Sequence, residues 1–381
     1  MKDLFPLFLL LLFTDACVDR LEFEAGDQGE AILVVDGLIT DQPGPYTVKL
    51  LRSSSVDDIL NFALPFNARS VTISDDAGNS EALKNQGEGQ WATSADGIRG
   101  EVGRAYSLHI EGSDGTLYES TPDRMRPVAE IDSLYFQWES FLPISGPAVN
   151  GFRVFMDTKG AEGKESLMRW RFTGTYKVLT FPELRKFNDQ NCISQSFPDP
   201  SPCSGVIWDG QLGGAGFLRT VGTCSCCLCW VDDFENKPRL SNNQIVTDGT
   251  FKNVEMGFVP FDPFRFYFNK YMVKVEQMSL SPEAFDFWKI IKDQKEGINS
   301  LFQPAFGRVR GNIHTSNPAK SATGIFYTSS VRKKILFIAS ADAQVPVPPF
   351  DVFPPETNCS LWLPCNQIFP NASTTPPPDW K

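Results

Sequence analysis

The 381-residue sequence contains only two histidines, His109 and His314, and it lacks the H-E-x-x-H, Walker and G-x-S-x-G motifs. The usual residues of a zinc hydrolase, a P-loop nucleotide site or a serine hydrolase are therefore missing. Basic residues are also scarce, since 35 Lys and Arg stand against 46 Asp and Glu, a net charge of −11. This acidic balance argues against nucleic acid or an anionic lipid surface as a partner.

Long apolar runs are equally scarce, and the clearest one, residues 4–13, is too short to span a bilayer. It follows a basic start and precedes Ala16 and a cysteine, an order typical of a bacterial lipoprotein signal peptide. We predict that residues 1–16 are removed and that Cys17 becomes an acylated, palmitate-bearing first residue, which anchors the chain to a membrane. An ordinary secretory signal is the alternative, because Asp15 is unusual at its position.

Phe (31), Gly (29) and Pro (28) are abundant, a composition typical of many short strands joined by turns. Short runs of alternating apolar and polar residues predict a mainly β fold. Its first domain, residues 28–122, is expected to be an immunoglobulin-like β-sandwich that follows a short tether, residues 17–27. The strands expected in this domain are 32–35, 46–51, 71–74, 105–111 and 116–120.

A larger antiparallel β-rich domain with one or two short helices is predicted for residues 129–343. The clearest helix has Ser281 as its N-cap and ends at Gly297, and its apolar spacing predicts that it lies against a sheet. A shorter helix is expected from Thr180. Residues 344–381 are rich in proline and predict an extended tail over the surface. The apolar face of the clearest strand contains Trp170, Phe172, Gly174, Tyr176 and Val178.

Eight cysteines remain after Cys17, an even number consistent with four disulfides in an exported protein. They are Cys192, Cys203, Cys224, Cys226, Cys227, Cys229, Cys359 and Cys365. Cys359 and Cys365 are close together in the tail, so they most simply pair with each other. Cys192 and Cys203 can take at most two of the four clustered cysteines, so at least one bridge is expected within 224–229. A zinc or iron–sulfur site is the alternative, although two separated C-x-x-C pairs are lacking.

The order of these features resembles a known family. The features are the acylated Cys17, the strand at 33–40, Arg169-Trp-Arg-Phe172, Cys229-Trp230, the helix at 281–288, Gly311-Asn-Ile313, the Cys359 pair and Pro378-Asp-Trp380. Together they resemble the Bacteroidota lipoproteins known as domain of unknown function 4249, over nearly the whole mature chain. The resemblance implies an outer-membrane lipoprotein that is often encoded beside a TonB-dependent receptor. It implies no established enzyme activity and no agreed catalytic residues.

Other polar patterns give weak chemical signals. Residues 87–92 partly match a dinucleotide-binding fingerprint, but their surroundings predict a turn. His109 lies on the polar face of a predicted strand and His314 in a predicted loop, so solvated side chains are expected. Asp232 and Asp233 are expected in a solvated turn, because neighbouring side chains on a strand point to opposite faces and cannot easily share a cation. We predict no catalytic residue, no metal and no cofactor.

The lipoprotein signal, the disulfide-rich β architecture and above all the family resemblance favour a non-enzymatic accessory lipoprotein that is anchored in the outer membrane through Cys17 and exposed on the cell surface. Its expected partner is a TonB-dependent β-barrel receptor, for which it would capture a ligand or whose mouth it would cover. Aromatic-rich loops of residues 129–343 are expected to make the contact. The alternatives are an independent adhesin or glycan-binding module and, less favoured, a secreted hydrolase, which would need two inward-facing carboxylates.

Overall fold

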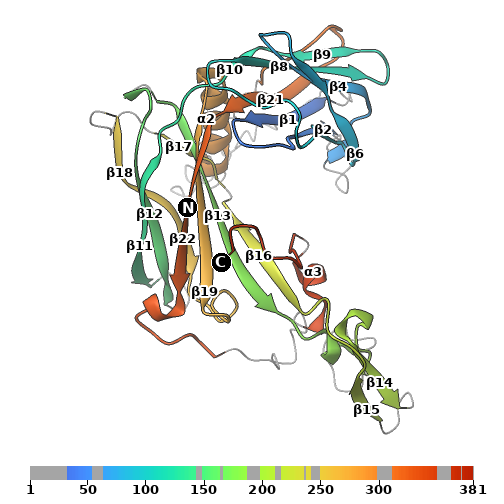
Figure 1. Cartoon of the computed structure of the whole chain (residues 1–381), viewed down its shortest axis with the longest axis vertical. Helices are drawn as coiled ribbons and strands as arrows, with labels where there is room; N and C mark the ends of the chain where they lie inside the picture. The colour runs from blue at the N-terminus through green and yellow to red at the C-terminus, as the bar shows by residue number, and fades with distance from the viewer. Residues whose placement is uncertain are drawn as a thin grey trace, which may run out of the picture.

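The computed structural model describes residues 32–53, 63–142, 148–163, 166–186, 198–210, 216–235, 237–241, 249–297, 311–349, 362–369 and 371–380. The predicted signal peptide 1–16, Cys17 and the tether 17–27 lie outside these ranges. The described residues form five β-sheets and two α-helices, so the mainly β prediction is confirmed (Figure 1).

The first domain packs two sheets face to face. In its first strand Leu33, Val35 and Ile39 point inward and are at most 1% exposed, as strand alternation requires. They meet Ile73 and Leu108 of the opposite sheet in one core. The first sheet contains β1 (Leu33–Thr40), β2 (Thr47–Ser53), β3 (Ala63–Pro65), β6 (Lys84–Gly87), β7 (Gln90–Ala92) and β21 (Ala322–Ser329). The second contains β4 (Ala68–Asp75), β5 (Ser80–Ala82), β8 (Ala105–Gly112), β9 (Leu117–Ser120), β10 (Asp123–Arg124) and β20 (Ile313–Thr315).

The first domain is not a continuous stretch of the chain, which corrects the predicted boundaries 28–122 and 129–343. β21 pairs in parallel with β1 along its full length, from Leu33 opposite Ala322 to Thr40 opposite Ser329. β20 pairs with β9 in the other sheet. Two strands assigned by sequence to the second domain therefore complete the first. A parallel pair needs a long connection, so the order of strands along the chain does not reveal it.

The second domain packs a three-stranded sheet against a larger one. The predicted face of β13 is buried as expected, and Trp170 and Phe172 share one core with Phe152 and Val154 of the opposite sheet. The smaller sheet contains β11 (Ile131–Phe141), β12 (Val149–Lys159) and β18 (Thr250–Pro260). The larger contains β13 (Met168–Leu179), β16 (Leu228–Phe234), β17 (Arg239–Leu240), β19 (Lys270–Ser279) and β22 (Val331–Ala339).

The predicted helix is α2 (Pro282–Gly297). Its N-cap is Ser281, whose Oγ accepts a hydrogen bond from the Ala284 N–H at 3.2 Å. The helix packs against a sheet as predicted, since Ala284 shares a core with Tyr327 of β21. Because β21 belongs to the first domain, α2 links the two domains (Figure 1). The short helix expected near Thr180 is the 3₁₀ turn η2 (Pro182–Leu184).

Asp41 fixes the junction between the two domains. The chain passes from β21 into β22 through Ser330, and the Asp41 carboxylate accepts hydrogen bonds from the Ser330 hydroxyl at 2.6 Å and the Val331 N–H at 2.8 Å. The Arg332 guanidinium adds an ion pair at 2.8 Å. Burial opposes ionisation, but the hydrogen bonds from Ser330 and Arg332 hold the pKa of Asp41 below its ordinary value.

The described part of the tail lies against the larger sheet of the second domain. Ser373 forms a β-bridge with Trp230 of the edge strand β16. The Trp380 ring then makes edge contacts with Trp230 and with Phe337 of β22, and Asp379 pairs with Lys333 at 3.1 Å. The tail therefore crosses the outer face of this sheet. It also contains α3 (Cys365–Ile368), and the 3₁₀ turn η4 (Ser340–Asp342) precedes it.

None of the helices in the described part of the chain combines the length and the hydrophobicity needed to cross a bilayer.

Candidate functional site

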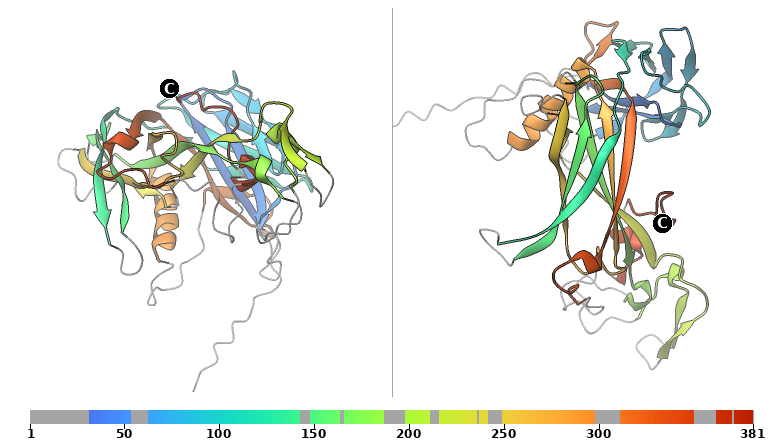
Figure 2. Two further views of the ribbon diagram at one scale, coloured as in Figure 1. Left: turned by 90° about the horizontal axis from the view of Figure 1, so that it is seen from below. Right: turned by 60° about the vertical axis from the view of Figure 1, so that its left-hand side comes forward.

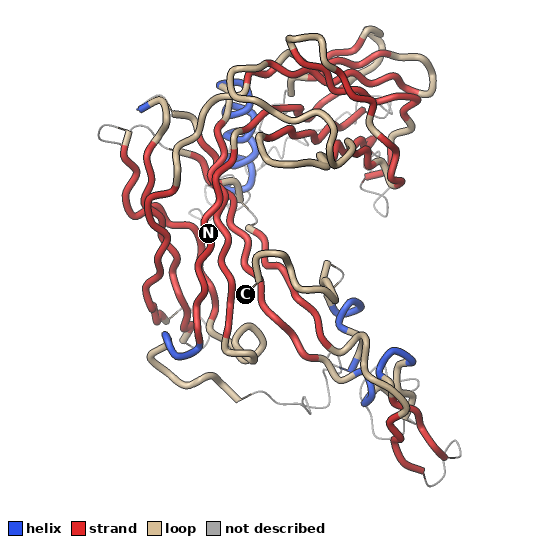
Figure 3. Tube along the Cα trace, viewed as in Figure 1, coloured by secondary structure: helices blue, strands red, loops and turns tan. Residues whose placement is uncertain are grey.

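A two-stranded hairpin projects from the second domain at the end away from the sandwich (Figures 1 and 2). It is formed by β14 (Val206–Gly210) and β15 (Gly216–Thr220), which pair from Val206 opposite Thr220 to Gly210 opposite Gly216. Within the described residues these strands pair only with each other. Loops and short helical turns separate the hairpin from the large sheet (Figure 3).

The hairpin exposes apolar side chains on both of its faces. Register and alternation place Ile207 and Phe217 on one face and Trp208 and Leu218 on the other. Phe217 is 62% exposed and Val221, just after β15, is 54% exposed. The two charged side chains here, Asp209 and Arg219, pair with each other at 2.7 Å. The surface is therefore apolar, without net charge, and covered by no other described part of the chain.

Two disulfides hold the base of this hairpin. An isolated two-stranded hairpin is at best marginally stable in water, so its attachment matters. Cys203, just before β14, bonds to Cys226, with a Cα–Cα distance of 5.7 Å. The Cys224–Cys227 disulfide, 5.8 Å between Cα atoms, tightens the segment that follows β15. The expected bridge within the cysteine cluster is therefore present. The 3₁₀ turn η3 (Pro202–Ser204) leads into the hairpin.

The tail cysteine does not pair as predicted. Cys365 bonds to Cys229 of β16 and not to Cys359, and both bonded cysteines are 0% exposed. Proximity in sequence favoured the local pair, but the fold places the start of α3 against β16, 136 residues away along the chain. Cys192 and Cys359 lie outside the described residues. All six described cysteines are disulfide-bonded, so none of them is a thiolate available to zinc or to an iron–sulfur cluster.

The remaining sequence candidates lie apart from one another. His109 lies on the polar face of β8, where its Nε2 is 2.8 Å from the Ser74 hydroxyl. His314 is exposed on β20, a strand and not the predicted loop. Gly87 ends β6 and residues 88–89 form the turn into β7, so the turn predicted for 87–92 covers only part of that stretch. In the part of the chain that the structure describes, no three His, Cys, Asp or Glu side chains are grouped to hold a metal ion.

Asp232 and Asp233 lie on strand β16, so the predicted solvated turn is wrong. Asp232 accepts a hydrogen bond from the Thr175 hydroxyl at 2.5 Å. Asp233 pairs with Arg265 at 2.8 Å and accepts a hydrogen bond from the Tyr271 hydroxyl at 3.0 Å. The two carboxylates have different partners on opposite faces, as strand geometry requires. Burial and then the charge of Asp233 raise the pKa of Tyr271 well above its ordinary value, so this group keeps its proton.

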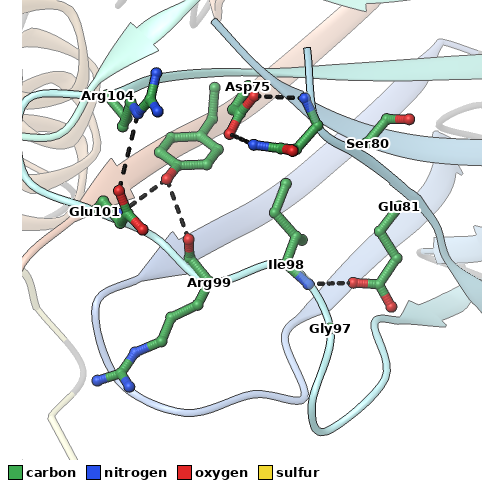
Figure 4. Close-up of a pocket in the computed structure, with 10 residues that line it drawn as sticks. Asp75, Ser80, Glu81, Gly97, Ile98, Arg99, Glu101 and Arg104 are labelled. Atoms are coloured by element: carbon green, nitrogen blue, oxygen red, sulfur yellow. Dashed lines mark hydrogen bonds and ion pairs between the residues drawn. The ribbon is translucent and has the colours of Figure 1, made fainter. Parts of the chain in front are cut away.

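A polar pocket of about 380 Å³ lies in the first domain (Figure 4). Two of its three carboxylates accept hydrogen bonds from the backbone: Asp75 accepts from the Asn79 N–H at 2.8 Å, and Glu81 accepts from the Ile98 N–H at 2.6 Å, whereas Glu101 pairs with Arg104 at 3.9 Å. Burial opposes the shift, but these hydrogen bonds hold the pKa of both carboxyls below the ordinary range. They act as loop anchors and form no acid–base pair of the kind that glycoside hydrolysis needs.

A second pocket, of about 360 Å³, lies beside α2 and β17 and is partly lined by Glu235. The Glu235 side chain is 12% exposed and forms an ion pair with Arg239. Burial raises the pKa of Glu235 to about 7, although the Arg239 charge opposes that shift. Its Oε1 atom, the one paired with Arg239, is inaccessible to solvent, so this oxygen belongs to a buried ion pair.

Sequence reasoning predicted aromatic contact loops in the second domain but not this hairpin. A signal was present: apolar residues 206–208 and 217–218 flank a Gly-rich stretch, and cysteines stand on both sides of the pair.

A comparison with models of protein families matches residues 18–335 to the family described as Domain of unknown function (DUF4249). A search of curated proteins finds no match to the chain.

Proposed function

The chain belongs to the DUF4249 family, and on this premise we propose that it is a non-enzymatic accessory lipoprotein of a TonB-dependent transport system. In this proposal it has the Bacteroidota lipoprotein character that the sequence resembles. Cys17 carries the lipid, the outer membrane holds the anchor, and the folded domains stand on the cell surface. A β-barrel receptor is its partner, and the protein captures a ligand for the receptor or covers its mouth.

The observation that carries the proposal is the apolar hairpin formed by residues 206–210 and 216–221. Large exposed apolar side chains that no described part of the chain covers are typical of protein contact surfaces. Aromatic residues such as Trp208 and Phe217 are enriched at the buried centres of interfaces. Strand β11 also ends away from the sandwich, on the other side of the second domain from the hairpin (Figure 1). Its last residue, Phe141, and the following Leu142 are exposed too, but they form a separate apolar site.

Because of the predicted lipid anchor, the contact between the hairpin and the receptor can be weak and still be functional. A lipid at Cys17 confines the chain to the membrane that holds the receptor, which raises the effective concentration of each partner for the other. A small apolar surface is then sufficient for stable association. Substituting serine for Cys17 should release the protein from the membrane fraction. Continued sedimentation of C17S with outer membranes would contradict lipid anchoring through this residue.

The test of function is affinity purification of the tagged, membrane-anchored protein in mild detergent. The wild type should recover a β-barrel receptor at about one to one. The variant Phe217→Ser with Val221→Ser should lose it, because these side chains are exposed and their loss leaves the core intact. The matched control is Leu117→Ser, which removes an equally exposed apolar side chain from the sandwich, 55% exposed, and should keep the receptor.

The possible outcomes test separate parts of the proposal. Recovery of the wild-type protein alone would refute the transport role and favour an independent surface adhesin. Equal recovery of the receptor by the hairpin variant would keep the transport role and remove the hairpin as its contact. Loss of the receptor by the Leu117→Ser control as well would show that removing any exposed apolar side chain weakens the complex. The hairpin would then not be the specific contact surface.

A further inference from the structure

The Cys224–Cys227 disulfide differs from the other described disulfides in its accessibility. Both of its cysteines are partly exposed. Each of the other two has at least one deeply buried member: Cys226 is 6% exposed, although its partner Cys203 is partly exposed, and Cys229 and Cys365 are both 0% exposed. Thiol–disulfide exchange requires a thiolate to reach a sulfur atom of the bond, so access strongly affects its rate. An external thiol therefore has the freest approach to Cys224 and Cys227.

The same disulfide closes a very short loop. Its cysteines are three positions apart, in the order Cys224-Ser-Cys-Cys227, whereas the other described disulfides join positions 23 and 136 apart. A short loop restricts the unfolded chain less than a long one, so opening it weakens the fold less. The bond can therefore open and close while the surrounding structure persists.

Backbone hydrogen bonds hold the segment on both sides of this disulfide. The Thr180 N–H donates to the Cys227 carbonyl at 2.8 Å, which ties the segment to the end of β13. The Ser225 N–H donates to the Cys203 carbonyl at 2.9 Å. The Cys365 N–H donates to the Cys226 carbonyl at 3.0 Å. None of these bonds involves a sulfur atom, so they remain when the Cys224–Cys227 bond is broken, and the two sulfur atoms stay near each other.

We propose that the Cys224–Cys227 disulfide is a thiol–disulfide exchange site for an external dithiol, such as that of a disulfide oxidoreductase. One thiolate of the dithiol attacks the sulfur of one cysteine, the Cys224–Cys227 bond breaks, and a mixed disulfide and a free cysteine thiolate form. The second thiolate of the dithiol then attacks the mixed disulfide and releases the other cysteine. The dithiol loses two electrons and becomes a disulfide, and its two protons pass to Cys224 and Cys227.

The proposed exchange site lies next to the disulfide that holds the base of the hairpin. Cys226, the cysteine that binds the hairpin base through Cys203, lies between the two exchanging residues in sequence. Exchange at the surface therefore acts next to the brace without opening it. This inference depends on disulfide access and loop size alone, so it holds whether or not the hairpin contacts a receptor.

The experiment is timed reduction of the folded mature chain, carrying Cys17→Ser, with limiting dithiothreitol in native buffer. Samples are quenched with iodoacetamide, and the fraction alkylated at each of the six cysteines of the described disulfides is measured over time by peptide mass spectrometry. Cys224 and Cys227 should be labelled together, at least about tenfold faster than the other four, which are Cys203, Cys226, Cys229 and Cys365. Earlier labelling of any of those four, or one common rate for all six, would overturn the proposal.

Two controls test the structural cause of the selectivity. The variant Cys224→Ser with Cys227→Ser should lose only the fast phase and keep the wild-type labelling rates at the other four. If that variant does not fold, the wild type in denaturant serves instead, because selectivity that comes from burial must disappear when the chain unfolds. Selectivity that survives unfolding would show that local sequence, and not the fold, sets the rate, and the proposed site would be refuted.

Discussion

Replacing Glu235 with glutamine should stabilise the protein at pH 8 and have little effect at pH 5. Burial raises the pKa of this carboxyl from an ordinary 4.5 to about 7. At a pH between these two values, the folded wild type therefore keeps the Glu235 proton, whereas the unfolded chain has released it. The stability that this proton contributes is fully present below about pH 4.5 and is lost as pH rises through about 7.

The size of the effect follows from the same values. Each pH unit between the two pKa values corresponds to about 1.4 kcal/mol, so the whole interval is worth about 3 kcal/mol. The side chain is only 12% exposed, which limits solvent screening. Glutamine carries no charge at any pH and has nearly the same shape. The variant should therefore gain about 1–3 kcal/mol relative to the wild type between pH 5 and pH 8.

Urea unfolding of the wild type and E235Q at intervals from pH 5 to pH 8 measures this difference directly. The control is E296Q, which removes an equal charge from an exposed position on the rim of the same pocket. It should follow the wild type across the range. Parallel pH profiles for the wild type and E235Q, or an E235Q that is less stable at pH 8, would refute the assignment of a buried, easily protonated Glu235.

Three further predictions concern the disulfides, the domain junction and the tail. A non-reducing peptide map should link Cys229 to Cys365, and replacing both with alanine should cost about 4–5 kcal/mol because the bond closes a long loop. D41N should lose about 2 kcal/mol in urea unfolding near pH 7, and this deficit should shrink as pH falls below about 4, where the wild-type carboxyl loses its advantage. W380A should lower stability by about 1–2 kcal/mol in thermal melts through its contacts with Trp230 and Phe337, whereas an unchanged melting temperature would place the tail off the sheet.

The local sequence determined several of the strands and the main helix. The alternation in 105–111 predicts β8, and the Ser281 cap with the apolar spacing that follows predicts α2. These features depend on side chains only a few positions apart, so they can be read without knowing the fold. The even number of cysteines and their clustering likewise predicted a bridge within 224–229.

Only the tertiary structure decided which distant segments meet. The sequence of the strand 322–329 does not predict its parallel pairing with β1, and the sequence around Cys365 does not predict its disulfide with Cys229. The apolar residues 206–208 and 217–218 are compatible with a hairpin, but they do not show that it projects with no other described part of the chain over it. Pairing, disulfide choice and exposure are set by the sum of many long-range contacts, whereas sequence patterns record mainly the preferences of neighbouring residues.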